Sequence, residues 1–170
     1  MSFEPKFWSF VVAAVLCGCG NSDGNGNPNL PCTADRCDAV CGDGCTPSCP
    51  EFGDLCRATC GDRCEFTCES GPNCEVVCGN DCDAQCRSIS SCTAATGSGS
   101  QYSCSSASNC TVELGDGSTA ECQSVGNCNI TCLGSCTATC RSVGVCNVNC
   151  EQGGELDCGD GVSVCGIDCP

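Results

Sequence analysis

Histidine is absent from this 170-residue chain, and methionine, tryptophan and tyrosine occur once each. Without histidine the chain cannot form a Ser-His or Cys-His nucleophile pair or an H-E-x-x-H zinc site. The C-x2-C motif of thioredoxin-type redox proteins is missing as well. We therefore expect no enzyme, no catalytic residue and no cofactor.

Large apolar side chains are also scarce, because aromatic residues make up 4% of the chain. A conventional core of bulky residues is therefore excluded, and another source of stability is required. The chain has 28 cysteines, a content typical of a disulfide scaffold. Disulfides persist in oxidising compartments, so the composition predicts an exported protein.

Lysine occurs only at Lys6, close to an apolar run from Phe7 to Leu16. This run is too short to span a bilayer and fits the core of a signal peptide. Leu16-Cys17-Gly18-Cys19 follows directly and resembles the lipobox of bacterial lipoproteins, L-x-G-C. The resemblance implies a signal peptide over 1–18, lipidation of Cys19 by a diacylglycerol and an acyl chain, and membrane anchoring. Residues 19–31 are rich in Gly and Asn and are predicted to form a flexible tether.

Basic residues are few in the predicted mature part. It contains twenty acidic residues and five arginines, a net charge of −15. Such a surface repels phosphate backbones, so we expect no nucleic-acid partner. An acidic surface also keeps an exported protein soluble.

A cysteine recurs every 18 residues between Cys56 and Cys146, which predicts a repeat domain over 32–170. The fullest copies have the spacing C-x3-C-x3-C-x3-C-x5. Within each half, the pattern C-x-h-x-C, with h apolar, places both cysteines and the apolar residue on one face of a short strand. Gly opens most of the three-residue links, and we expect it to supply a positive φ there. Two strands and two turns per copy predict an all-β, flattened β-solenoid.

Two other folds agree with part of the pattern. A spacing of four residues would also give a cysteine stripe on a helix, although the repeated Gly and the residues Pro47, Pro50 and Pro72 disfavour helix. A chain of small disulfide-rich repeats with little regular structure is the second alternative.

Defects in the repeat indicate which cysteines pair. The copy from Cys92 has Thr96 and Ser100 at the second and third positions, and the copy from Cys110 has Leu114 and Ser118 there. Joint loss is expected of a bonded pair, because loss of one partner leaves a reactive thiol. Pairing the second with the third position gives Cys41–Cys45, Cys60–Cys64, Cys78–Cys82 and Cys132–Cys136.

The chain ends indicate how the outer positions pair. Cys32 precedes the first full copy and Cys165 opens a truncated one, so pairing each fourth position forward with the next first position leaves neither alone. This scheme predicts Cys32–Cys37, Cys49–Cys56, Cys68–Cys74, Cys86–Cys92, Cys104–Cys110, Cys122–Cys128, Cys140–Cys146 and Cys158–Cys165. Cys150 and Cys169 remain, at equivalent positions of adjacent coils, and are predicted to pair.

Two kinds of metal binding are compatible with the residues present. Asp43, Asp62, Asp81 and Asp116 recur in the Gly-opened links, and calcium binds carboxylate oxygens. Reduced cysteines would bind soft metals. Solvated turn residues and disulfides are the simpler interpretations, so we expect no metal ligand.

The lipobox and the C-x3-C repeats together resemble cysteine-rich repeat lipoproteins of Gram-negative envelopes. Gly20 after the anchor, rather than Asp, resembles the outer-membrane sorting pattern. The resemblance implies a structural or adhesive module of the cell envelope, with a protein or glycan partner that the sequence does not identify. A metal-handling lipoprotein is the alternative.

Overall fold

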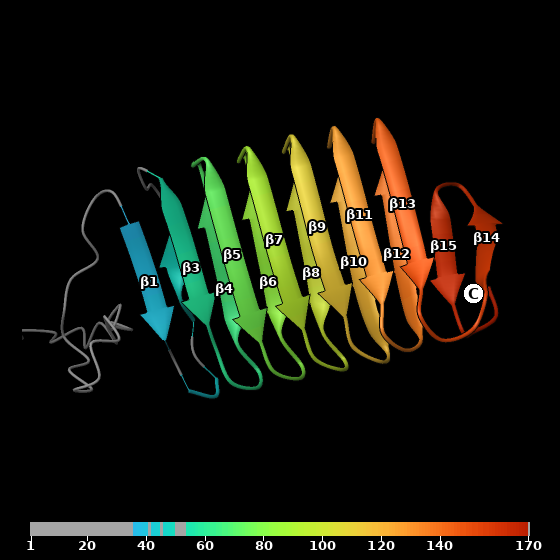
Figure 1. Cartoon of the computed structure of the whole chain (residues 1–170), viewed down its shortest axis with the longest axis horizontal. Helices are drawn as coiled ribbons and strands as arrows, with labels where there is room; N and C mark the ends of the chain where they lie inside the picture. Colours follow the sequence, from blue (N-terminus) through green and yellow to red (C-terminus); the bar gives the residue numbers. More distant parts are fainter. Residues whose placement is uncertain (1–35, 41, 45, 50–53, 170) are drawn as a thin grey trace, which may run out of the picture.

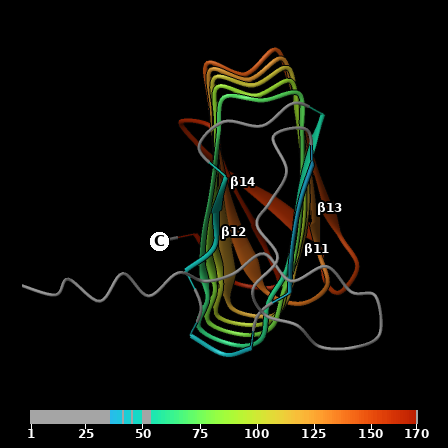
Figure 2. The ribbon, with the colours of Figure 1, turned by 90° about the vertical axis from the view of Figure 1, so that its left-hand side faces the viewer.

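The computed structural model describes residues 36–40, 42–44, 46–49 and 54–169, which form a stack of coils with two facing sheets (Figure 1). Viewed along the stack, the coils superimpose as a narrow rectangle (Figure 2). The predicted signal peptide, Cys19 and the tether lie outside the described residues. So do Cys32, Cys41 and Cys45, and with them the predicted bridges Cys32–Cys37 and Cys41–Cys45.

Each coil contributes one strand to each sheet. Sheet A has seven strands in the order β1 (Arg36–Val40), β3 (Leu55–Thr59), β5 (Asn73–Cys78), β7 (Ser91–Thr96), β9 (Asn109–Leu114), β11 (Asn127–Cys132) and β13 (Val145–Cys150). Sheet B has eight, in the order β2 (Ser48–Cys49), β4 (Glu65–Glu69), β6 (Asp83–Arg87), β8 (Gln101–Ser105), β10 (Ser118–Gln123), β12 (Cys136–Arg141), β15 (Val162–Cys165) and β14 (Glu155–Gly159).

Neighbouring coils pair in parallel at the 18-residue period. Cys74, for example, lies opposite both Cys56 and Cys92 in the ladder. This register confirms the predicted β-solenoid with two short strands per coil. The helical alternative is wrong, since no helix occurs in the described part of the chain. Accordingly, the described residues include no helix long and apolar enough to cross a membrane.

The interior consists of cysteines and mostly small apolar side chains, as the alternation predicts. The middle residues of the half-copies lie between the two sheets, with at most 3% of their surface exposed in the coils from Cys56 to Cys140. They are Ala58, Val76, Ala94, Val112 and Ile130 in sheet A, and Phe66, Ala84, Tyr102, Ala120 and Ala138 in sheet B. Phe66 and Tyr102 are the two aromatic members of this set.

The five-residue links add a column of core residues that the sequence analysis does not predict. Ile89, Ala107 and Val125 are buried at the centre of successive links, 18 residues apart. The preceding serine of each link has a positive φ, 53° at Ser88 and 55° at Ser106. This left-handed turn points the next residue inward. The apolar residue at period 18 is the signal that could have revealed it.

The glycines that open the three-residue links act differently from the prediction. None of Gly61, Gly79, Gly97 and Gly115 has a positive φ. They are required because the coils stack closely. A Cβ atom on Gly97 would lie 2.7 Å from the backbone of Gly79, and one on Gly115 would overlap Gly97. The expectation of a left-handed glycine at these positions is therefore wrong, and the absence of a side chain is what the stack requires.

The stack ends in a hairpin. After β14 the chain reverses at Gly159, Asp160 and Gly161, all with positive φ, and β15 runs back along β12 in antiparallel pairing. Sheet B thereby gains β15 and β14 beyond β12, whereas sheet A stops at β13.

Candidate functional site: the internal sulfur ladder

The most distinctive chemical feature of the molecule is a column of disulfides along the turns that lead from one coil to the next. The structure contains the predicted forward bridges Cys49–Cys56, Cys86–Cys92, Cys104–Cys110, Cys122–Cys128 and Cys140–Cys146, and the second-to-third bridge Cys132–Cys136. Except at Cys140 and Cys146, the bonded cysteines of these pairs are at most 3% exposed. Each forward bridge closes the five-residue link between successive coils.

Thiols replace disulfides in the coils that contain Cys60 to Cys82. Cys64, Cys68, Cys78 and Cys82 are thiols, so the predicted bridges Cys60–Cys64, Cys68–Cys74 and Cys78–Cys82 are not present. The backbone is not the cause, since Cys68 and Cys74 lie in register with the bonded Cys86 and Cys92.

Burial gives a physical reason for the reduced state of one of these pairs. Burial, followed by the hydrogen bond and proximity of Cys82, raises the pKa of the Cys78 thiol well above its usual range. Thiol–disulfide exchange requires the thiolate, so a raised pKa slows oxidation of this pair.

The two bridges nearest the C-terminus differ from the prediction. Cys150 is bonded to Cys165 and Cys158 to Cys169, in place of Cys150–Cys169 and Cys158–Cys165. Cys150 lies beside Cys132 in sheet A, and the antiparallel β15 brings Cys165 beside Cys136 in sheet B. The Cys150–Cys165 bridge therefore repeats the Cys132–Cys136 bridge one layer further along. The prediction was wrong because it took Cys165 as the start of a new coil rather than the end of a reversed strand.

Serine hydroxyls continue the ladder where cysteines are missing. The Cys82 N–H donates to Ser100 Oγ at 3.1 Å, and the Ser100 N–H donates to Ser118 Oγ at 3.0 Å. The Ser118 hydroxyl in turn donates to the Gly97 carbonyl at 3.1 Å. The sequence analysis treated these positions only as lost cysteines, and serine at both third positions was the available signal.

Two hydroxyls inside the stack have no partner among the described residues, Thr96 Oγ1 and the Tyr102 OH. Burial, with a smaller contribution from Cys74 and Cys68, raises the pKa of the Tyr102 hydroxyl. The interior near these residues is thus apolar enough to keep the phenol neutral.

The acidic turn residues form hydrogen bonds between coils. Asp43 accepts a bond from the Asp62 N–H at 3.0 Å, and Asp62 accepts one from the Asn80 N–H at 2.7 Å. Asp116 Oδ1 accepts from both the N–H and the hydroxyl of Ser135, which lowers the pKa of the Asp116 carboxyl. Within the described part of the chain, the groups of three side chains close enough to share a metal ion contain only cysteines. The geometry therefore does not favour calcium binding at the turns.

Soft-metal ligands do come together inside the stack. The Sγ atoms of Cys56, Cys68 and Cys74 lie within 4.8 Å of one another, and so do those of Cys74, Cys86 and Cys92. Each group includes sulfur atoms that are in disulfides, Cys56 in the first and the Cys86–Cys92 pair in the second. Such a group could supply a full set of thiolates to a soft metal only after reduction.

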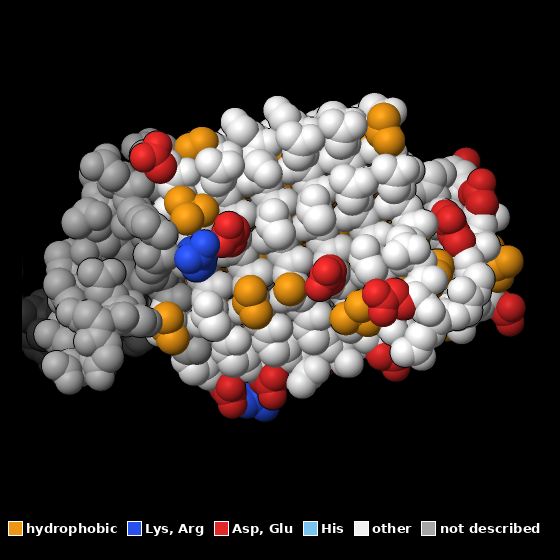
Figure 3. All heavy atoms as spheres, in the orientation of Figure 1, with side chains coloured by type: hydrophobic (Ala, Val, Ile, Leu, Met, Phe, Trp, Pro, Cys, Tyr) orange, Lys and Arg blue, Asp and Glu red, His pale blue; other side chains and the backbone are white. Residues whose placement is uncertain are grey.

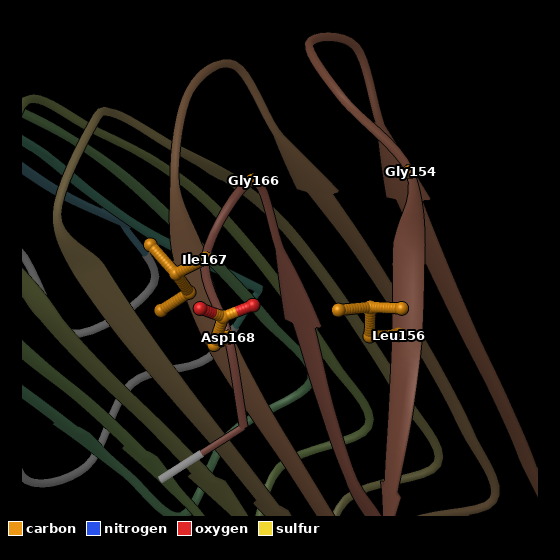
Figure 4. A pocket seen from close by; sticks show the side chains of 5 residues that line it. All are labelled: Gly154, Leu156, Gly166, Ile167 and Asp168. Carbon is orange, nitrogen blue, oxygen red and sulfur yellow. The ribbon is translucent and has the colours of Figure 1, made fainter.

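The outer faces of the sheets are polar. Asparagine side chains bond across coils, from Asn127 to Asn109 and from Asn147 to Asn129. A shallow hollow of about 360 Å³ crosses strands β6 to β12 on sheet B and is lined mainly by hydroxyl, amide and charged side chains. At the C-terminal end, a second hollow of about 350 Å³ lies between Leu156 of β14 and Ile167 and Asp168, which follow β15 (Figure 4).

Comparisons with known proteins give no relative from which a function could be transferred. No protein-family model, no curated protein and no solved structure matches the chain.

Proposed function

We propose that this chain is an exported lipoprotein, anchored at Cys19, whose repeat domain is a rigid, non-enzymatic structural or adhesive module of the bacterial envelope, on the outer membrane. The observation that carries the proposal is the column of disulfides between successive coils. These bridges form in an oxidising compartment, and they take over the stabilising role of bulky apolar side chains.

The disulfide column favours a spacer or scaffold over a binding pocket. Forward bridges join sheet B of one coil to sheet A of the next at regular intervals along the stack, as at Cys104–Cys110 and Cys122–Cys128. A stack held in this way resists local opening, because each coil is bonded to its neighbour. Such resistance suits a protein exposed to proteases outside the cytoplasm.

Labelling of the full chain in a Gram-negative host tests the anchor. With alkyne-tagged palmitate we expect label in the membrane fraction, loss of label with Cys19→Ser, and retention of label with the matched control Cys17→Ser. A chain that is released unlabelled into the medium, or a Cys19→Ser variant that keeps its label, would contradict the proposal.

Proteolysis tests rigidity independently of the anchor. Arg57, Arg63, Arg87 and Arg141 are trypsin sites within the described stack. We expect the oxidised protein to stay uncut at these arginines and the reduced protein to be cleaved at all of them. Cleavage at equal rates in both states would mean that the bridges do not hold the stack together.

Soft-metal handling is the second candidate, favoured by the close approach of the Cys56, Cys68 and Cys74 sulfur atoms. The discriminating experiment combines elemental analysis of the native protein with a count of thiols after unfolding. Bound copper or zinc that disappears in a Cys68→Ser variant would support metal handling. A metal-free protein would support the structural module.

A further inference from the structure

The two sheets end differently at the C-terminal end of the stack. Residues 18 positions beyond β13 would be expected to continue sheet A, but this part of the chain includes β15, which pairs with β12 in sheet B. Sheet A therefore has one strand fewer than sheet B. In Figure 1, β13 is the last strand of its sheet, with the β15–β14 hairpin beside it.

The backbone edge of β13 is open. The N–H groups of Val145 and Glu151 donate to β11 carbonyls, which fixes the direction of the alternate residues in between. Because successive residues of a strand direct their N–H and C=O groups to opposite sides, Cys146 and Val148 direct theirs away from β11. Sheet A provides no strand on that side.

The inward face of β13 is uncovered as well. Cys128 and Ile130 of β11 are at most 1% exposed, whereas the equivalent Cys146 is exposed and Val148 is half-buried. One more strand beside β13 would cover these side chains, just as β13 covers those of β11. The open position thus combines a hydrogen-bonding edge with unburied apolar surface.

Ordinary protection of a sheet edge is absent at β13. Natural edges are protected by charged residues, proline or bulges, and β13, with the sequence VCNVNC, has none of these. The edge strand of sheet B differs, because β14 has Glu155 and Asp157 and a register shift in its pairing with β15. Of the two edges at this end, β13 is therefore the one suited to accept another strand.

Charge around the open edge indicates what can bind there. After Arg141 the chain has no Lys or Arg, and its acidic residues are Glu151, Glu155, Asp157, Asp160 and Asp168. Figure 3 shows acidic side chains gathered at this end of the molecule. A second copy, with a net charge of −15, would be repelled. Residues 1–35 have Lys6 as their only cation, so they do not complement this surface either.

We propose that the open edge of β13 binds an extended, basic segment of a partner protein by β-strand addition. The segment would run parallel to β13 and continue sheet A. Small apolar side chains at alternate positions would cover Cys146 and Val148, and lysine or arginine at the positions in between would face the acidic end. The inference does not depend on the lipid anchor.

A blocked hexapeptide of alternating lysine and valine is the probe, added to the oxidised mature protein. We expect saturable binding and about tenfold slower hydrogen exchange at the Val148 amide, which gains a partner on binding. Two control peptides separate the contributions. Replacing lysine by glutamate should abolish binding through charge, and N-methylation of the lysines should abolish it by removing the N–H groups that face β13 while the charge is kept.

Protein variants locate the site. Val148→Pro removes an N–H that the β11 ladder does not use, and we expect about tenfold weaker binding from the loss of one hydrogen bond. Val148→Ala, the matched control, should bind as the parent does. Equal binding of the N-methylated peptide, equal binding by a folded Val148→Pro variant, or self-association through this edge would overturn the proposal. The peptide controls decide the question even if the proline variant does not fold.

Discussion

The amide of Ser100 donates a hydrogen bond of 3.0 Å to the hydroxyl of Ser118, one coil further along the stack. Both serines are 1% exposed and stand where the fuller copies have their third cysteine. At these two coils a hydrogen-bonded column therefore replaces a disulfide.

Ser118→Ala tests this column. The substitution leaves the buried Ser100 N–H without its acceptor, and an unsatisfied buried group costs about 1–3 kcal/mol of unfolding free energy. Equilibrium unfolding in guanidinium chloride measures the loss. Ser103→Ala on the outer face of the same strand as Ser100 is the control and should change stability by less than about 0.5 kcal/mol. Equal effects of the two substitutions would contradict the proposed role of Ser118.

Tyr102→Phe should leave the protein as stable as the parent or stabilise it by about 1 kcal/mol, because the buried hydroxyl has no partner among the described residues. The reciprocal change, Phe66→Tyr, puts a hydroxyl into an equivalent inward position of sheet B and should destabilise the protein. Thermal unfolding of both variants provides the measurement. A clear loss of stability in Tyr102→Phe would mean that the hydroxyl is hydrogen-bonded.

Gly115→Ala should destabilise the stack by about 1–3 kcal/mol, the usual cost of overpacking, because the added Cβ would overlap the backbone of Gly97. Gly154 offers a matched control, since a Cβ there has open space and its φ is not positive. Gly154→Ala should be neutral in the same unfolding measurement. Similar midpoints for the two variants would show that close stacking does not explain the glycine at 115.

The repeat could be predicted from the sequence because a period of 18 and an alternation of two are both visible in single residues. Cys56, Cys74 and Cys92 specify the register, and the apolar residue between paired cysteines specifies the buried face. The C-terminal cap could not be predicted in this way. Its reversal depends on three consecutive left-handed residues, Gly159 to Gly161, in a segment that does not follow the repeat. The reduced state of Cys78 and Cys82 also depends on burial, which cysteine spacing does not report.

The carboxyl of Asp116 should titrate below its usual range because the hydroxyl and the N–H of Ser135 donate to its charged form. A lowered pKa in the folded state contributes stability above the ordinary Asp pKa of about 3.9, and this contribution is lost as the pH falls through the folded pKa. Ser135→Ala should therefore raise the pKa of Asp116, measured by carbon NMR titration. Ser135→Thr, which keeps the hydroxyl, should leave it low. An unchanged pKa in Ser135→Ala would assign the shift to the backbone donors alone.

Removal of single bridges should show that the cap disulfide contributes more stability than a bridge within the stack. Cys122–Cys128 closes a separation of 6 residues and Cys150–Cys165 one of 15. In the loop-entropy model these correspond to about 2 and about 3 kcal/mol. Paired serine substitutions, Cys122→Ser with Cys128→Ser and Cys150→Ser with Cys165→Ser, avoid leaving a reactive thiol behind. Urea unfolding of both double variants gives the comparison. The cap variant should also show faster hydrogen exchange in β15 while β10 stays protected, because its bridge is what joins β15 to β13. If the variant without Cys122–Cys128 proved the less stable, the bridges would act by packing within the core rather than by restricting the unfolded chain.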